Sequence, residues 1–216
     1  DEIRILLADQ SIDVLALNET RLNSSISDGQ VHIRGYDILR LDRDRNGGGV
    51  CMYIRNSLPY HYRSDLVRED LESISVEIRK PNSCPFIIST IYRPPSATVD
   101  IFTKIESLLS NVDNEDKEIY LLGDLNCNLL DTTNFAAKKL ASIMEIYQLI
   151  QAIDKPTRIT ESSASLLDIC VTSAPDKIVC SDVIRTGGSD HSLIYVVRKI
   201  NASTKTNRTR EISFRN

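Results

Sequence analysis

Short apolar runs recur along the chain, and each is bounded by polar or turn-forming residues. Runs at residues 12–17, 50–55, 86–92 and 118–122 predict buried strands, and runs at 166–171, 177–184 and 193–197 predict three more. Between residues 74 and 78, apolar residues alternate with Ser75 and Glu77, which is the period of a half-exposed strand. The pattern therefore predicts a chain rich in strands.

Three segments have helical spacing instead. Residues 2–10 and 100–111 place apolar residues on one face, and residues 135–150 form the clearest amphipathic pattern, while residues 23–35 form a polar loop. Strands outnumber these helices, and several strands adjoin without a helix between them. We therefore expect an α+β fold in which a mixed pair of sheets has helices outside, rather than a doubly wound parallel sheet.

Composition limits the class of protein. The chain has 216 residues, of which 41% are hydrophobic and 26% charged, as in soluble globular domains, and it has no apolar run of the roughly 18 residues that a membrane span needs. Its five cysteines are an odd number without C-x-x-C spacing, and the first residues lack the features of a signal peptide. We expect a reduced, intracellular protein without a zinc site.

Charge is unevenly distributed. The net charge of −4 argues against a protein that coats DNA through broad charge neutralisation, although a metal-dependent nuclease remains compatible with it. Residues 198–216 carry six basic residues and one acidic residue. We expect one domain over residues 1–200, followed by a basic linker or tail at 201–216.

Polar clusters lie at the ends of three predicted strands. They are Asn18-Glu19-Thr20, Gly123-Asp124-Leu125-Asn126 and Ser189-Asp190-His191. A sheet that gathers carboxylates, amides and an imidazole at one rim has the groups needed for metal-assisted phosphate chemistry.

Each cluster also has an ordinary structural explanation. Glu19 suits Mg²⁺, which prefers oxygen ligands, but a glutamate at a strand end is often only surface charge. Asp124 and Asn126 are two residues apart and would face the same side of an extended chain, yet Gly, Asp and Asn also favour turns. His191 is either an acid/base group or part of a capped turn. Residues 47–49 are all glycine, but a strand rather than a helix follows, so they do not form a P-loop.

The order of the motifs resembles the endonuclease/exonuclease/phosphatase superfamily from about residue 13 to residue 197. The landmarks are Leu17-Asn18-Glu19-Thr20, Ile91-Tyr92-Arg93-Pro94, Gly123-Asp124-Leu125-Asn126, Ser165-Leu166-Leu167-Asp168 and Ser189-Asp190-His191. Within it, the chain looks most like the endonuclease domain of non-LTR (LINE-type) retrotransposons. That likeness is carried by Arg45-Asn46-Gly47-Gly48-Gly49-Val50, Tyr92-Arg93-Pro94-Pro95, Pro156-Thr157-Arg158 and Leu166-Leu167-Asp168-Ile169.

The resemblance implies a four-layer sandwich, in which two mixed sheets pack face to face and helices cover the outside. It also implies a Mg²⁺-dependent enzyme, with Mn²⁺ as a possible substitute, that nicks double-stranded DNA to leave a 3′-hydroxyl. In such elements that hydroxyl primes a reverse transcriptase domain downstream, so action in the nucleus is expected. We expect the isolated domain to be a monomer.

The resemblance assigns roles to twelve residues. Asp124 activates the attacking water and Asn126 holds the phosphate, while Asp168 orients His191 and Tyr92 reaches the scissile phosphate or leaving group. Glu19 binds the metal, and Asp190 adds charge on the metal side. The residues expected to contact phosphate or DNA are Asn18, Arg45, Arg93, Thr157 and Ser165.

One departure from the family pattern bears on activity. The family opens with a strand that carries an Asn near the metal, whereas this sequence begins at the predicted helix that follows such a strand. The resemblance thus implies a sandwich lacking one strand and a site lacking one polar ligand. Alternatives are an abasic-site nuclease, a phosphatase acting on inositol phosphates or lipids, and an inactive truncated relic.

Overall fold

The computed structural model describes residues 2–9, 11–44, 46–81, 83–187 and 189–200, so the predicted basic tail at 201–216 lies outside the described residues. The first part of the chain forms α1 (Glu2–Leu6), β1 (Val14–Asn18), α2 (Asp28–Val31), β2 (Tyr36–Leu41), β3 (Val50–Arg55), β4 (Tyr60–Tyr62), β5 (Glu72–Ile78) and β6 (Phe86–Tyr92). The rest forms α3 (Asp100–Asn114), β7 (Glu118–Asp124), α4 (Phe135–Ile146), β8 (Ile150–Gln151), β9 (Arg158–Ile159), β10 (Ala164–Ser165), β11 (Asp168–Thr172), β12 (Ile178–Ile184) and β13 (Leu193–Arg198).

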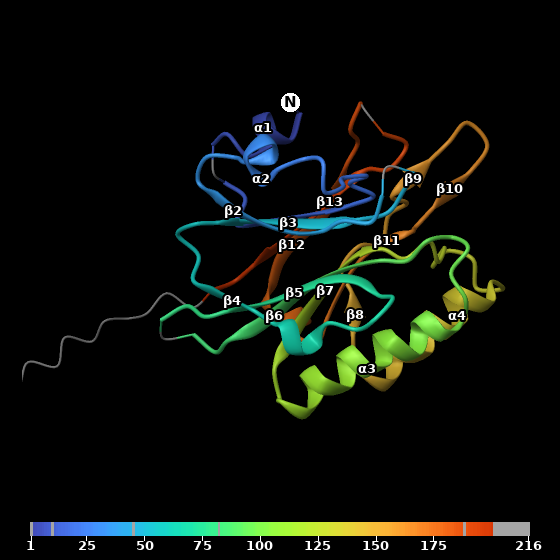
Figure 1. Ribbon diagram of the computed structural model, residues 1–216. Helices are drawn as coiled ribbons and strands as arrows, with labels where there is room; N and C mark the ends of the chain where they lie inside the picture. Colours follow the sequence, from blue (N-terminus) through green and yellow to red (C-terminus); the bar gives the residue numbers. More distant parts are fainter. Residues whose placement is uncertain (1, 10, 45, 82, 188, 201–216) are drawn as a thin grey trace, which may run out of the picture.

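These elements form an α+β sandwich of four layers (Figure 1). One sheet has the order β4-β5-β6-β7-β11-β8, and it is mixed because β6 and β7 run parallel while its other pairs are antiparallel. A three-stranded sheet, β1-β3-β2, faces it, and the pair β12-β13 packs beside the larger sheet. Helices α1 and α2 cover the smaller sheet, while α3 and α4 cover the larger one. The predicted fold class is confirmed.

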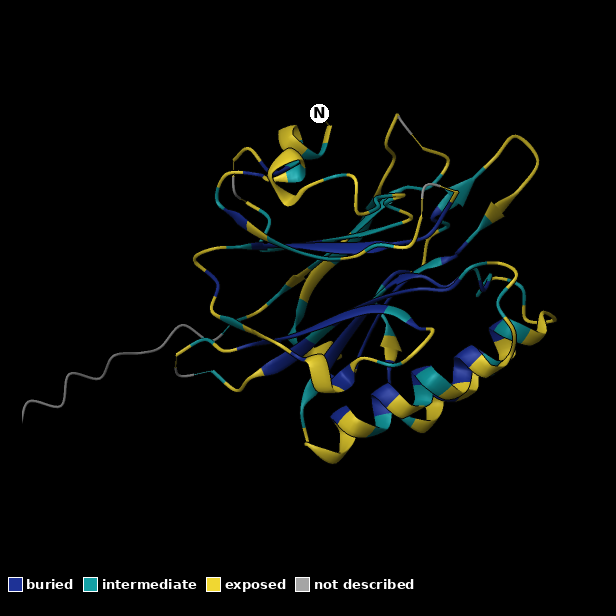
Figure 2. Cartoon of the chain, in the orientation of Figure 1, coloured by how far each residue is buried: buried dark blue, intermediate teal, exposed yellow. Residues whose placement is uncertain are grey.

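Three apolar clusters correspond to the three interfaces between these layers. Strand β3 shows how one sequence serves two of them, because Val50, Met52 and Ile54 point into the space between the sheets while Cys51 and Tyr53 point toward α1 and α2. Both faces of this strand are therefore buried, as Figure 2 shows for the central ribbons. A third cluster fills the space between the larger sheet and helices α3 and α4.

Strand β5 departs from its predicted half-exposed character. Ser75 and Glu77 are both buried, since the Ser75 hydroxyl lies 2.7 Å from that of Ser89 and the Glu77 carboxylate binds Arg63, Arg79 and Lys117. Burial opposes ionisation of Glu77, but hydrogen bonds from Arg79 and Lys117 lower its pKa to about 2. Polar alternation in sequence does not reveal such partners, which come from other elements.

Boundaries differ from expectation where tertiary pairing decides them. The first helix ends at Leu6, and the helix predicted to reach residue 150 ends at Ile146, where Gln148 takes a positive φ of 51° and Ile150 joins β8. Strands β2, β4, β8, β9 and β10 and the short helix α2 are additional to the predicted elements. Most of these strands have only two or three residues, too few for a period to show in sequence. No helix in the described ranges is long and apolar enough to cross a membrane.

A close backbone approach fixes the end of β7, where the acidic cluster begins. Gly123 has a φ of 137°, and a Cβ built on it would lie 1.9 Å from the carbonyl oxygen of Ile91 in β6. Only glycine fits this position, because any side chain would push β6 and β7 apart.

Replacing Gly123 should therefore destabilise the fold. We expect Gly123→Ala to lower the free energy of unfolding by on the order of 3 kcal/mol, because it combines a backbone clash with an unfavourable φ. Urea denaturation followed by circular dichroism measures the change. Gly187→Ala is the control, since a Cβ there meets no atom within 4 Å, and equal stabilities of the two variants would contradict the prediction.

Candidate active site

The pairing of β7 with β11 brings two aspartates together. These strands run antiparallel, and their register places Asp124, the last residue of β7, directly opposite Asp168, the first residue of β11. Ligand atoms of Asp124, Asp168 and His191 all lie within 4.8 Å of one another. The structure thus gathers residues from two of the predicted motifs and from the strand between them.

His191 is held by Asp168. Its Nδ1 lies 3.0 Å from Oδ2 of Asp168, and its backbone forms an isolated bridge with Arg158. The hydrogen bond to Asp168 raises the pKa of His191, although its partial burial acts in the opposite direction. The predicted carboxylate–imidazole pair is present, and it favours the imidazolium form.

Asp124 is buried and carries a perturbed carboxyl group. Burial and the nearby charge of Asp168 raise its pKa to about 6, even though the backbone N–H of Asn126 donates to Oδ1 at 2.9 Å. The amide nitrogen of Asn126 donates to Oδ2 at 3.3 Å and to the backbone carbonyl of Arg93 at 2.9 Å. Asn126 therefore orients Asp124 here, and its amide hydrogens are engaged within the protein rather than directed at a phosphate.

The smaller sheet supplies the other side of the site. Oδ1 of Asn18 accepts the backbone N–H of Asp124 at 3.1 Å, and its amide nitrogen lies 3.5 Å from Oγ1 of Thr90, so Asn18 ties the two sheets together at this rim. Glu19 follows with a positive φ of 51°, and the Tyr92 hydroxyl donates to its Oε1 at 2.6 Å. Burial and this hydrogen bond raise the pKa of Tyr92, which keeps the hydroxyl protonated.

Thr157 was predicted to contact phosphate, but its hydroxyl is buried and binds backbone groups instead. Its side chain is fully buried, and its Oγ1 accepts the backbone N–H groups of Leu167 at 3.1 Å and Asp168 at 3.0 Å. Its carbonyl accepts the N–H of Ser192 at 2.7 Å, and its own N–H donates to the carbonyl of Ser165 at 2.9 Å. Thr157 is a positioning residue that holds the start of β11 and the chain after His191, and Ser165, half-buried in β10, pairs with it through the backbone.

Two further assignments need correction. Arg93 is buried, and its guanidinium donates to the carbonyls of Leu125 at 3.2 Å and Ala97 at 3.1 Å, so it holds the turn after Asp124 and does not face solvent. The carboxylate of Asp190 is paired with Nε of Arg158 at 2.7 Å, and this hydrogen bond lowers the pKa of Asp190. Asp190 is thus committed to an arginine, and Arg45 lies outside the described residues.

Sequence reasoning missed two groups beside the site. Glu72 begins β5 directly opposite Tyr92, and it binds Arg43 and the N–H of Gly49 in the glycine segment. Nothing in the local pattern marks Glu72 or Arg43, because the contacts join β5 to the loop between β2 and β3, far away in sequence. Arg158 stood within the Pro156-Thr157-Arg158 motif, and that motif was the available signal for it.

The donor groups fit a divalent cation. Both Asp168 and Glu19 raise the pKa of the buried Asp124 carboxyl, so the rim carries more negative charge than its partners neutralise. Carboxylate oxygens are the ligands that Mg²⁺ and Mn²⁺ favour, and a cation would relieve this repulsion. Among the described residues, ligand atoms of Asp124, Asp168 and His191 form the one group of three close enough to share an ion. His191 as an imidazolium has no free lone pair for a metal, so the carboxylates are the groups that fit a cation.

A two-sheet sandwich flanked by helices is the fold of the endonuclease/exonuclease/phosphatase superfamily. The chain belongs to the endonuclease-reverse transcriptase family, whose model matches residues 86–195, just over half of the sequence. None of the curated proteins matches the sequence.

Solved structures share the fold at low sequence identity. The endonuclease domain of TRAS1, a telomere-specific non-LTR retrotransposon, is similar with a TM-score of 0.73 and 15% identity, covering 93% of this chain and 92% of that one. The Neisseria 3′ phosphatase NExo, bound to a product DNA hairpin, gives 0.69 and 12%, covering 92% and 93%. An AP endonuclease from Archaeoglobus fulgidus gives 0.66 and 14%, again covering 92% and 93%. At these identities the likeness establishes the fold alone.

The raised pKa of Asp124 predicts a stability gain when its charge is removed. Because the folded pKa of about 6 exceeds the ordinary value of 3.8, ionisation disfavours the folded state; the penalty is absent below pH 3.8 and complete above about pH 6. Asp124→Asn should raise the free energy of unfolding at pH 8 by on the order of 1–3 kcal/mol, and by little at pH 3.5. Urea denaturation with a chelator present tests this. Asp113→Asn, on the exposed face of α3, is the control, and a gain that does not depend on pH would contradict the account.

Thr157→Val should perturb His191 from a distance. The change keeps shape but leaves the N–H groups of Leu167 and Asp168 without their acceptor, which costs on the order of 1–3 kcal/mol and displaces Asp168. The pKa of His191 should then fall toward its ordinary value, as an NMR titration of the ring protons would measure. Thr172→Val is the matched control, because Thr172 is a buried threonine at the far end of β11 whose Oγ1 accepts one N–H. A similar effect of both variants on His191 would refute a specific positioning role.

Proposed function

We propose that this chain is a divalent-metal-dependent endonuclease that hydrolyses a phosphodiester bond in one strand of duplex DNA and leaves a 3′-hydroxyl. The observation that carries the proposal is the buried Asp124 carboxyl, with a pKa of about 6, beside the Asp168–His191 pair. A base whose pKa lies near the working pH accepts a proton efficiently, and an imidazolium beside it offers a donor for phosphate oxygen. Acid and base thus stand within reach of one phosphate group.

Asp124 takes a proton from the attacking water, and Asn126 keeps its carboxylate oriented by the hydrogen bonds to both oxygens. His191, charged through its contact with Asp168, donates to a non-bridging oxygen of the phosphate as negative charge builds there. The Tyr92 side chain is buried, but its hydroxyl lies at the same rim. Once its bond to Glu19 opens, the hydroxyl reaches the phosphate or the leaving 3′-oxygen, which takes a proton from it or from water as the P–O3′ bond breaks.

Glu19 is the residue we propose as metal ligand. Its carboxylate is partly exposed, its neighbours Tyr92 and Arg21 leave it accessible, and its charge adds to the repulsion at Asp124. A bound Mg²⁺ or Mn²⁺ supplies Lewis acidity and neutralises charge on the phosphate. Asp190 is paired with Arg158, so we propose that it acts on the metal only through the electrostatic potential of its negative charge.

Duplex DNA as substrate and a retrotransposon context rest on the comparisons. The matching family is described as endonuclease-reverse transcriptase, and the similar TRAS1 domain is an endonuclease of a non-LTR retrotransposon. In that setting the 3′-hydroxyl at the nick serves as primer for a reverse transcriptase domain in the full-length protein, and the enzyme acts on chromosomal DNA in the nucleus.

A plasmid assay tests the proposal. Supercoiled plasmid incubated with the purified chain and Mg²⁺ should be converted to open circles, conversion should stop with a chelator, and the nick should be extendable by a DNA polymerase. His191→Ala and Asp124→Ala should each slow nicking by about 10²-fold or more, because each removes a proton-transfer or charge-stabilising group. His61→Ala, on the exposed edge strand β4, is the matched histidine control and should nick normally.

Other outcomes separate the alternatives. Cleavage only of duplex that contains an abasic site would indicate a repair-type nuclease, and release of inorganic phosphate from small esters without nicking would indicate a phosphatase. Near wild-type nicking by His191→Ala would refute the assigned chemistry. A folded chain with none of these activities would identify an inactive relic.

A further inference from the structure

Two partly exposed arginines lie near the catalytic residues, one bound to the cross-strand partner of Tyr92 and the other beside His191, and each is bound to a carboxylate. We infer that Arg43 and Arg158 bind backbone phosphates of DNA on either side of the one that is cleaved, and that Glu72 and Asp190 hold them ready to do so. The inference rests on the proposed endonuclease function and deepens it by assigning the residues that bind the strand.

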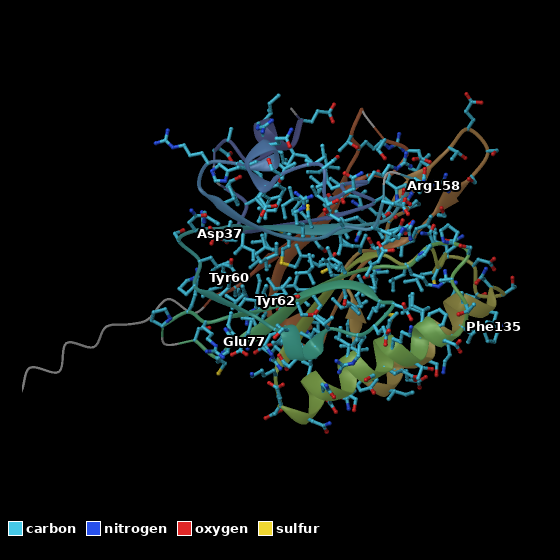
Figure 3. The ribbon with its side chains drawn as sticks, viewed as in Figure 1. Asp37, Tyr60, Tyr62, Glu77, Phe135 and Arg158 are labelled. Carbon is cyan, nitrogen blue, oxygen red and sulfur yellow. The ribbon has the colours of Figure 1, made fainter. Side chains whose placement is uncertain are left out.

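Arg158 stands on the side of His191. Its backbone bridges to that of His191, and its Nε donates to Oδ2 of Asp190 at 2.7 Å. Its side chain is 42% exposed, and within the described part of the chain its two Nη groups have no hydrogen-bond partner. Figure 3 shows Arg158 at the base of the β9–β10 hairpin, which projects from the sandwich.

Arg43 stands on the side of Glu19 and Tyr92. Its Nη1 lies 2.7 Å from Oε1 of Glu72, and its Nε donates to the carbonyl of Gly47 at 2.8 Å. Glu72 is the cross-strand partner of Tyr92 in the β5–β6 pair, and its carboxylate holds the Arg43 guanidinium. The guanidinium therefore lies close to the catalytic rim.

Gly48 makes room for Arg43. A Cβ built on Gly48 would lie 2.3 Å from Cζ of Arg43, so the guanidinium packs directly on the backbone of the glycine segment. This packing and the bond to Glu72 restrict the side chain, which is nevertheless 41% exposed. The glycine segment (residues 47–49) does not form a P-loop; within it, Gly48 leaves the room that the Arg43 guanidinium needs.

The ion pairs of Arg43 with Glu72 and of Arg158 with Asp190 are better explained by phosphate binding than by a contribution to folding stability. Exposed ion pairs contribute little to folding, typically less than about 1 kcal/mol. A guanidinium has five donors, and a carboxylate that occupies one edge leaves the others for a second anion. Because the side chain is already ordered, binding a phosphate costs less conformational entropy.

A series of contacts connects each arginine to the catalytic residues. On one side Arg43 connects through Glu72 to Tyr92, and Tyr92 to Glu19; on the other, Arg158 connects through Asp190 to His191. A strand whose scissile phosphate lies between Asp124 and His191 would thus meet one fixed cation in each direction. This positions the strand without reading its bases.

Salt-dependent binding tests the inference. A fluorescein-labelled DNA duplex is titrated with the full chain in the presence of a chelator, at salt concentrations from about 50 to 200 mM, and affinity is plotted against salt on logarithmic axes. Each phosphate contact contributes about 0.9 to the slope, so Arg43→Gln and Arg158→Gln should each reduce it by nearly that amount and weaken binding several-fold at low salt. Arg158→Lys should recover most of the slope, since the charge is retained.

Arg79→Gln is the matched control. Arg79 is 55% exposed, and its Nε donates to Oε1 of Glu77 at 2.8 Å, so it reproduces the tethered geometry. Glu77 lies across the molecule from Arg158 (Figure 3), at the opposite end of β5 from Glu72. This variant should keep the wild-type slope.

The outcomes are distinct. Wild-type slopes for both Arg43→Gln and Arg158→Gln, with the wild type binding and nicking DNA, would overturn the inference and leave the proposed function standing. The same loss of slope in Arg79→Gln would overturn it by showing a general charge effect. A wild-type chain that neither binds nor nicks DNA would overturn both.

Discussion

The antiparallel register of β7 against β11 is the constraint on which the site depends. It places Asp124 opposite Asp168, and a shift by one residue would turn one of these side chains to the other face of the sheet. The close approach of Gly123 to Ile91 fixes how β7 lies on β6, and the hydrogen bond from the Asp124 N–H to Asn18 brings in the second sheet. One rim thereby collects residues from β1, β6, β7, β11 and the chain before β13.

This assembly brings like charges together at a cost in stability. Asp124 is buried close to Asp168 and Glu19, and its pKa of about 6 measures how strongly the environment resists its ionisation. His191 and Asn126 offset part of this repulsion, while Thr157 and Arg93 hold the backbone around it. Repulsion between buried carboxylates is typical of functional sites, because it shifts a carboxyl pKa toward the working pH and favours binding of a cation. The ion pairs around Glu77 at the other end of β5 show the contrast, because there each charge is matched and the pKa is lowered.

Much of this arrangement could be predicted from the sequence. Apolar runs located the long strands β3, β6, β7 and β12 to within about two residues, and motif order indicated the superfamily and the residues gathered at the rim. Partners that come from distant strands could not be predicted: the burial of Ser75 and Glu77, the inward turn of Arg93 and the task of Thr157 all follow from contacts across the fold. Arginine and threonine in a site motif suggested contact with phosphate, yet burial decides whether such a side chain can reach one. The Asp190–Arg158 pair shows the same limit, since a carboxylate expected to add charge on the metal side is paired with an arginine.

We propose that the rim is one coupled acidic site, poised for proton transfer and for a divalent cation. The most direct test is a ¹³C NMR titration of the aspartate side-chain carboxyls, with Asp124→Asn to assign the signal, first with a chelator and then with Mg²⁺. The Asp124 carboxyl should titrate with a pKa of about 6 without metal, and Mg²⁺ should move this pKa downward. A carboxyl that titrates at its ordinary value and does not respond to Mg²⁺ would contradict it.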